Sequence, residues 1–279
     1  METVLESASR KVVIGPDKPF VIIGERINPT GRKVLAAQLE AGDFTTVEQD
    51  AVSQIEAGAA MLDVNAGVPG ADEAKMLVGL VELVQELTEA PLSVDSAMDS
   101  ALAAALPVCQ GKPLVNSVNG EDDRLEKILP LIKERGAAVI GLVFDEAGPS
   151  MDPDERCRIA KLIVERAADH GIPQQDVLID PLAMTVGAEP QAAVVALETI
   201  RRVREELGNN MTIGASNISF GLPGRKVINN SFLALAMAAG LTSAITNPLV
   251  PETPMTLMAC DLLLARDEYG MNWIKAHRK

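Results

Sequence analysis

The chain has 279 residues, 47% of them hydrophobic, and a formal net charge of −14. This length and apolar content suit one large α/β core, and the negative charge argues against a nucleic-acid-binding protein, which needs a basic face for the phosphates. No apolar run approaches the roughly 18 residues of a membrane span, and residues 1–19 lack the apolar block of a secretory signal, so we expect a cytoplasmic protein without a membrane partner.

Short apolar runs alternate with helical patterns along the chain. Residues 1–19 are a lead-in segment whose apolar run and Gly-Pro turn predict a small hairpin at the bottom of a barrel. Strands are then predicted at 20–24, 60–65, 92–95, 113–116, 138–144, 177–180, 211–217 and 243–247. Helices are predicted at 33–40, 47–57, 73–89, 96–106, 124–135, 153–170, 192–207, 229–240 and 256–267, with Asp95 or Ser96 capping the fourth. Residues 25–31 have the composition of a loop.

Eight strands alternating with helices are the count of a (β/α)8 TIM barrel. No shift in composition marks a linker, so we expect residues 1–279 to form a single domain. The predicted strands end almost always in Asp or Asn: Asn28, Asp63, Asn65, Asp95, Asn116, Asp145, Asp180, Asn217 and Asn247.

Each of these residues alone could be a helix cap or an Asx turn, and we assign Asp145 and Asn247 to that role. In a barrel, however, the strand ends surround one cavity. Carboxylates and amides together suit a flat heterocycle that carries both hydrogen-bond donors and acceptors. A carboxylate is the natural acceptor for an amino-pyrimidine edge.

The usual catalytic groups are missing from these strand ends. His170 is predicted at a helix C-terminus and His277 in the basic tail, which argues against a zinc site or a Ser-His-Asp triad. The three cysteines are widely spaced and offer neither a disulfide framework nor a metal clamp, so no bound metal is predicted. Residues 221–226 are either a plain Gly/Pro loop or place Arg225 and Lys226 against an anionic substrate tail.

Seven short motifs appear in order at the predicted strand ends and adjoining loops: residues 23–28, 62–67, 93–96, 115–117, 179–182, 214–217 and 225–229. Together they resemble the pterin-binding methyltransferases, which include the methyltetrahydrofolate:corrinoid protein methyltransferases and the folate domain of cobalamin-dependent methionine synthase. The resemblance covers about residues 20–267.

This resemblance implies methyl transfer between N5 of tetrahydrofolate and the cobalt of a corrinoid that a separate protein supplies. It also implies a homodimer. Asp95, Asn116 and Asp180 match the residues that bind the amino-pyrimidine part of the pterin, and Asp63 and Asn65 match a pair that lines the same cavity. Glu25, Arg26 and Asn28 match a signature that shapes the site. Asn217 matches the asparagine near N5, and we hypothesise that it is catalytic, donating a hydrogen bond that strengthens in the transition state.

Two alternatives remain at this point, a dihydropteroate synthase and a non-catalytic folate-binding module. The synthases share the barrel and pterin pocket, but their first loop reads Asn-x-Thr-Pro-Asp-Ser-Phe and a late site reads Ser-Arg-Lys. Here the first loop is Asn28-Pro29-Thr30-Gly31 and the late site is Ser216-Asn217-Ile218-Ser219. These departures favour methyl transfer.

Overall fold

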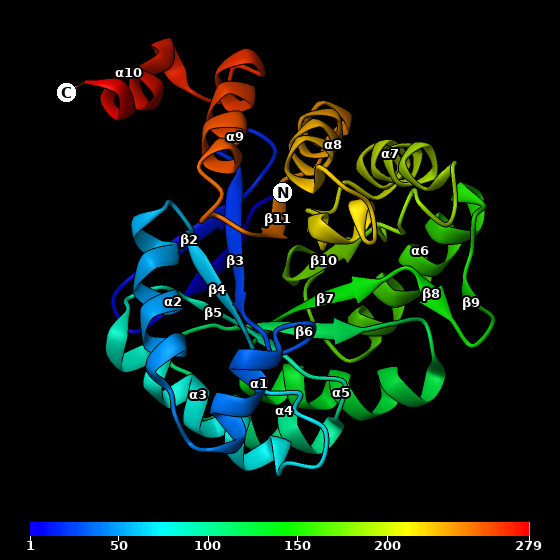
Figure 1. The fold of residues 1–279 in the computed structure, drawn as a ribbon. Helices are drawn as coiled ribbons and strands as arrows, with labels where there is room; N and C mark the ends of the chain where they lie inside the picture. Colours follow the sequence, from blue (N-terminus) through cyan, green and yellow to red (C-terminus); the bar gives the residue numbers. More distant parts are fainter. Residues whose placement is uncertain (279) are drawn as a thin grey trace.

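The computed structural model describes residues 1–278, with parallel strands at the centre and helices outside them (Figure 1). The central strands pair in the order β10-β7-β6-β5-β4-β3-β11, and every pair is parallel. Their bounds are β3 (Val21–Ile27), β4 (Met61–Asn65), β5 (Leu92–Asp95), β6 (Leu114–Val118), β7 (Ala138–Leu142), β10 (Val177–Asp180) and β11 (Ser243–Thr246). The predicted α/β barrel is therefore confirmed.

Residues 211–214 close the ring between β10 and β11. Met211 forms a parallel bridge with Ile179, and Gly214 forms one with Ile245. The predicted strand at 211–217 is thus reduced to two bridges. Its polar end turns instead into the 3-10 helix η4 (Ala215–Ser219), in which the Asn217 N–H donates to the Gly214 carbonyl oxygen at 3.2 Å.

An antiparallel hairpin of β1 (Thr3–Glu6) and β2 (Lys11–Ile14) precedes the barrel, as predicted. Its buried side chains Leu5, Val12 and Ile14 belong to the same apolar cluster as Ile23 and Met61 of the barrel strands. This hairpin covers the end of the barrel where the strands begin, so we look for the ligand site at the opposite end, where the strands finish.

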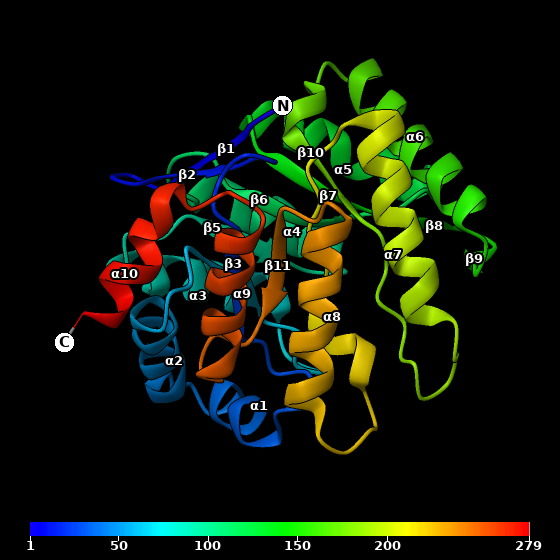
Figure 2. The same cartoon turned by 90° about the horizontal axis from the view of Figure 1, so that it is seen from above.

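Ten α-helices surround the strands within residues 1–278: α1 (Lys33–Glu40), α2 (Thr45–Glu56), α3 (Glu73–Leu87), α4 (Asp99–Ala105), α5 (Asp122–Arg135), α6 (Pro153–Asp169), α7 (Ala192–Arg202), α8 (Arg225–Ala239), α9 (Glu252–Leu263) and α10 (Met271–His277). The short elements are β8 (Phe144–Asp145), β9 (Gly148–Pro149), η1 (Leu106–Val108), η2 (Gln174–Asp176), η3 (Val203–Leu207) and η5 (Glu268–Gly270). In this part of the chain no helix has both the length and the apolarity to cross a bilayer. Figure 2 shows α10 beyond α9 at the edge of the barrel.

Several predicted boundaries were wrong. The helix predicted at 96–106 begins at Asp99, so neither Asp95 nor Ser96 is its N-cap; the Ser96 hydroxyl instead accepts a hydrogen bond from the Met98 N–H at 2.9 Å. The helix predicted from 229 begins at Arg225, because Gly224 adopts a left-handed conformation that ends the preceding loop. The first barrel strand continues to Ile27, which places Glu25 within the strand and not in a loop. Helix α10 was not predicted.

Candidate functional site

A cavity of about 670 Å³ opens where the barrel strands end. Its carboxylates are Glu25, Asp63, Asp95 and Asp180, its amides are Asn28, Asn116 and Asn217, and Arg225 lies at its edge. The structure therefore brings together residues that the sequence placed at six different strand ends. Their roles in binding and transfer remain predictions.

Strand register places Asp95 between two amide side chains. Asn65 pairs with Asp95 between β4 and β5, and Asp95 pairs with Asn116 between β5 and β6. Asp63 Oδ1 accepts hydrogen bonds from the Ser93 hydroxyl at 2.7 Å and from Asn116 Nδ2 at 3.1 Å. These bonds fix the Asn116 amide, so its remaining donor and its oxygen are left for a ligand.

Asn65 was predicted to line the cavity together with Asp63, but it is not part of the cavity wall. Its amide nitrogen donates to Asp95 Oδ2 at 2.9 Å, and its oxygen accepts from the Gly67 N–H at 2.8 Å. Asn65 thus holds Asp95, which does line the cavity.

Burial governs the protonation of the carboxyl groups. It raises the pKa of Asp63 and the pKa of Asp180 to about 6 in each case. Burial and the neighbouring charge of Asp63 together raise the pKa of Asp95 well above its ordinary range. Burial also raises the pKa of Glu25, although the Ser216 hydroxyl and two arginines oppose this. Groups that have lost their water in this way gain most from a ligand that presents N–H donors.

Hydrogen bonds of the neighbouring residue Ser216 fix the main chain beside Asn217. The neighbouring Ser216 hydroxyl donates to Glu25 Oε1 at 2.9 Å, and Arg225 Nη2 donates to the Ser216 carbonyl oxygen at 2.7 Å. A Cβ atom at position 214 would lie 3.0 Å from Asn217 Nδ2, so glycine gives this amide the space it occupies. The segment that carries Asn217 is thus held by Glu25 from the first strand and by Arg225 from α8.

Ser93 and Ser216 bond to cavity carboxylates and were missed by the sequence reasoning. Ser93 lies two residues before Asp95 on the same strand, so strand alternation was the signal that could have found it. Ser216 stands in a recognised motif, but its bond to Glu25 joins residues 191 positions apart, for which the sequence holds no local signal.

Other predicted residues have local roles. Asp145 and Asn247 each accept a hydrogen bond from the N–H two residues later, which confirms them as Asx turns. Asn28 likewise accepts a hydrogen bond from the Thr30 N–H, and it also lines the cavity. His170 is the C-cap residue of α6, as predicted. Lys226 lies outside the main cavity and lines a smaller groove that shares Arg225 with it.

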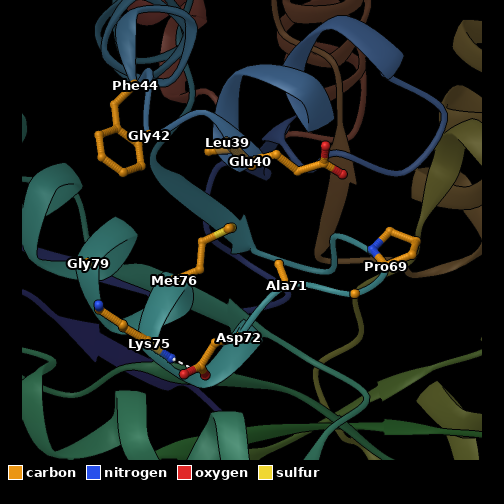
Figure 3. Close-up of a pocket in the computed structure, with 11 residues that line it drawn as sticks. Leu39, Glu40, Gly42, Phe44, Pro69, Ala71, Asp72, Lys75, Met76 and Gly79 are labelled. Carbon is orange, nitrogen blue, oxygen red and sulfur yellow. Dashed lines mark hydrogen bonds between the residues drawn. The ribbon is translucent and has the colours of Figure 1, made fainter.

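A second cavity of about 650 Å³ lies outside the barrel, between the end of α1 with the loop that follows it and the start of α3 with the loop that precedes it (Figure 3). Leu39, Phe44 and Met76 give it an apolar wall. Its Asp72 carboxylate is occupied as the N-cap of α3, since it accepts from the Lys75 N–H at 3.1 Å. The polar groups of the chain converge at the barrel end, which is therefore the candidate site. Among residues 1–278, no three His, Cys, Asp or Glu side chains are grouped so that they could hold a metal ion.

Comparison with known proteins places these observations in a family. The model of the pterin-binding enzymes matches residues 24–247. A methylcorrinoid:tetrahydrofolate methyltransferase of Eubacterium limosum is 33% identical over 265 residues, which cover 93% of this chain and 97% of that protein. A methionine synthase of Mycobacterium tuberculosis is 31% identical over 259 residues, covering 88% of this chain but only 22% of that longer protein.

Solved structures are similar in fold. Dihydropteroate synthase from Xanthomonas albilineans, in complex with 7,8-dihydropteroate, superposes with a TM-score of 0.72 and covers 94% of this chain and 99% of that one. The two sequences are 22% identical, so this likeness concerns the barrel and not the reaction.

Proposed function

The chain belongs to the family of pterin-binding enzymes, and we propose that it transfers a methyl group between N5 of tetrahydrofolate and the cobalt of a corrinoid protein. The observation that carries this proposal is the convergence of buried carboxylates and amides on one cavity at the open end of the barrel. The name and near full-length similarity of the Eubacterium limosum relative support the reaction.

In this proposal Asp95, Asn116 and Asp180 bind the amino-pyrimidine edge of the pterin. The ionised carboxylates accept hydrogen bonds from its amino group and ring N–H, and the Asn116 amide faces the carbonyl and ring nitrogens. Asp63 fixes Asn116 through the 3.1 Å hydrogen bond, and Asn65 fixes Asp95 through the 2.9 Å one. The ring is then held in one orientation before the corrinoid protein arrives.

We assign the contact to N5 to Asn217. When methyltetrahydrofolate is the donor, the bond from N5 to the methyl carbon breaks while a new one forms to cobalt, and N5 gains electron density that a donated N–H stabilises. When tetrahydrofolate is the acceptor, N5 loses its proton as the methyl group arrives, and the same side chain can accept an N–H through its oxygen. An amide carries both kinds of group and so serves both directions. The proton passes to or from water.

In this proposal the corrinoid protein and the folate are the two substrates, and Arg225 binds the anionic tail of the folate. Its Nε and Nη2 atoms already bond to Ser219 Oγ at 3.0 Å and to the Ser216 carbonyl oxygen, so the guanidinium is fixed at the edge of the cavity. Replacing Arg225 with Gln should weaken binding of folates with a charged tail more than binding of a bare pterin.

A visible spectrum tests the reaction directly. Enzyme, methyltetrahydrofolate and a reduced Co(I) corrinoid protein should yield the absorption of methyl-Co(III), at a rate that depends on enzyme concentration. A parallel mixture with dihydropterin pyrophosphate and para-aminobenzoate tests for pyrophosphate release by a dihydropteroate synthase. Turnover only in the second mixture would reject methyl transfer, and folate binding without turnover in either would identify a non-catalytic module.

We also propose a homodimer that forms through α8 and α9, which lie side by side in Figure 2. Leu235 on α8 is 56% exposed and Leu263 on α9 is 82% exposed, and in this proposal the partner subunit covers both side chains. Sedimentation equilibrium should give twice the chain mass, and Leu263→Lys should give a monomer. A monomeric wild-type protein would reject this part of the proposal.

A further inference from the structure

Arg156 on α6 is fully buried, and it is the largest of the buried side chains. Its guanidinium bonds to main-chain oxygens: Nε to Ser150 at 2.7 Å, and Nη1 to Pro181 at 2.7 Å and to Leu182 at 3.0 Å. A buried guanidinium is costly unless its donors are satisfied, so these bonds are part of what keeps the cation inside the protein.

Two of these bonding partners, Pro181 and Leu182, connect Arg156 to the candidate site. Pro181 and Leu182 directly follow Asp180, and the Leu182 N–H donates to Asp180 Oδ1 at 2.8 Å. Leu182 has a φ of 60°, a left-handed conformation that is unfavourable for leucine and needs support from its surroundings. By bonding to the carbonyl oxygens of this turn, Arg156 supports the conformation that aims the Leu182 N–H at the carboxylate.

Arg124 on α5 likewise bonds to main-chain oxygens, at the ends of β5 and β6. Its Nη2 donates to the Ser96 carbonyl oxygen at 3.0 Å and its Nη1 to that of Ala97 at 3.0 Å, immediately after Asp95. Its Nε and Nη2 donate to the Ser117 carbonyl oxygen at 3.1 and 2.8 Å, immediately after Asn116. One side chain therefore ties together the ends of β5 and β6.

We propose that Arg124 and Arg156 are positioning residues of the candidate site, each fixing the main chain directly behind a pterin-binding carboxylate and placing a positive charge near it. This inference rests on the proposed function, since it takes Asp95 and Asp180 to bind the pterin.

Several groups around the two carboxylates affect their pKa values, and in each case one of these arginines is among them. Asp180 faces Arg156 and the N–H groups of Leu182 and Gly214, which oppose the effect of burial on its pKa. Asp95 faces the carboxylates of Asp63 and Glu73, which raise its pKa, and is opposed by Arg124 and the Asn65 amide. In both cases the arginine is the cation that lowers the pKa.

Removing Arg156 should therefore raise the pKa of Asp180 above about 6. With a rise of about one unit, the lower end for loss of a nearby opposite charge, the ionised fraction at pH 6 would fall about fivefold, from roughly a half to roughly a tenth. At pH 8.5 it would scarcely change. Weaker pterin binding at pH 6 that recovers at pH 8.5 is thus the mark of an electrostatic role.

Arg135 provides a matched control, because it lies on the same helix as Arg124. It donates to the carbonyl oxygens of Leu106 at 2.9 Å, Cys109 at 2.6 Å and Gly111 at 2.9 Å, in the segment that leads into β6. It holds main chain as the other two arginines do, but none of the residues it bonds to follows a carboxylate of the cavity.

The test compares Arg124→Met, Arg156→Met and Arg135→Met by calorimetric titration with methyltetrahydrofolate from pH 6 to 8.5. We expect Arg156→Met to bind about fivefold more weakly at pH 6 and to recover in part by pH 8.5. Arg124→Met should also bind more weakly at pH 6, with a loss that shrinks as the pH rises, while Arg135→Met binds as wild type. If Arg156→Met does not fold, Arg156→Lys should keep the wild-type pH profile with a uniform loss of affinity.

Affinity losses in Arg124→Met and Arg156→Met that match Arg135→Met, or that are equal at every pH, would overturn the inference. Asp95→Asn and Asp180→Asn separate this outcome from failure of the proposed function. Unchanged binding in both Asp variants would reject the pterin-binding role itself, whereas weakened binding in them beside unaffected Arg variants would reject only the positioning role.

Discussion

Replacing Asp180 with Asn should make the protein more stable at high pH relative to wild type, while weakening pterin binding. Burial raises the pKa of Asp180 from an ordinary 3.8 to about 6. The folded chain therefore binds this proton more tightly than the unfolded chain, and ionised Asp180 destabilises the fold. The destabilisation is absent below pH 3.8, grows between pH 3.8 and 6, and is complete above pH 6.

The magnitude follows from the two pKa values. Their difference, at about 1.4 kcal/mol for each pH unit, gives about 3 kcal/mol at pH 8 and roughly half of that at pH 5. The side-chain amide in the Asp180→Asn variant can still accept from the Leu182 N–H, but its NH2 group would face the Gly214 N–H, at a pH-independent cost of about 1–3 kcal/mol. The stability difference between variant and wild type should thus rise by about 1.5 kcal/mol from pH 5 to pH 8.

Urea unfolding at the two pH values measures this difference, and titration with methyltetrahydrofolate measures affinity. Asp261→Asn is the control, because burial also raises the pKa of Asp261 to about 6, while its carboxylate accepts from the Phe20 N–H at 2.8 Å, outside the cavity wall. It should show the same pH-dependent gain in stability with unchanged affinity. A stability difference for Asp180→Asn that is equal at pH 5 and pH 8 would refute the reasoning.

Further predictions concern the transfer step, the support of Asp95 and the base of the barrel. Asn217→Ala should slow methyl transfer about 10²-fold in rapid-mixing spectra, because it removes a hydrogen bond that strengthens as N5 changes charge, and should bind methyltetrahydrofolate normally. A near wild-type rate would remove Asn217 from the mechanism. Asn65→Ala should weaken folate binding about tenfold in titrations near neutral pH, since Asp95 loses a hydrogen bond that favours its ionised form. Normal affinity there would contradict the indirect role of Asn65. Leu5→Ala should lower the free energy of unfolding in urea by about 2–5 kcal/mol without changing the transfer rate, because Leu5 is fully buried in one cluster with Ile23 and Met61 at the closed end of the barrel.

The architecture and the ring of polar strand ends were readable from the sequence because both depend on local patterns. Short apolar runs alternating with helical periodicity predict parallel strands, and the ends of parallel strands meet at one edge. Asp63, Asp95, Asn116 and Asp180 could therefore be assigned to one cavity before any contact was known.

What the sequence could not supply was the pairing between distant side chains. Asn65 has the same residue type and strand-end position as Asn116, yet it bonds to Asp95 while Asn116 faces the cavity. Arg124 and Arg156 read as ordinary polar residues on amphipathic helices, and only packing of α5 and α6 against the barrel aims them at the turns behind Asp95 and Asp180.

Protonation was likewise decided by the tertiary structure. The ordinary pKa of an aspartate is a property of the residue, whereas its value of about 6 in Asp63 and Asp180 comes from burial among segments far apart in the chain. The sequence by itself determined which groups reach the open end of the barrel, because strand ends are local. The fold decided which of them bind one another, which face the cavity and which hold a proton, because those properties depend on distances between residues that only folding brings together.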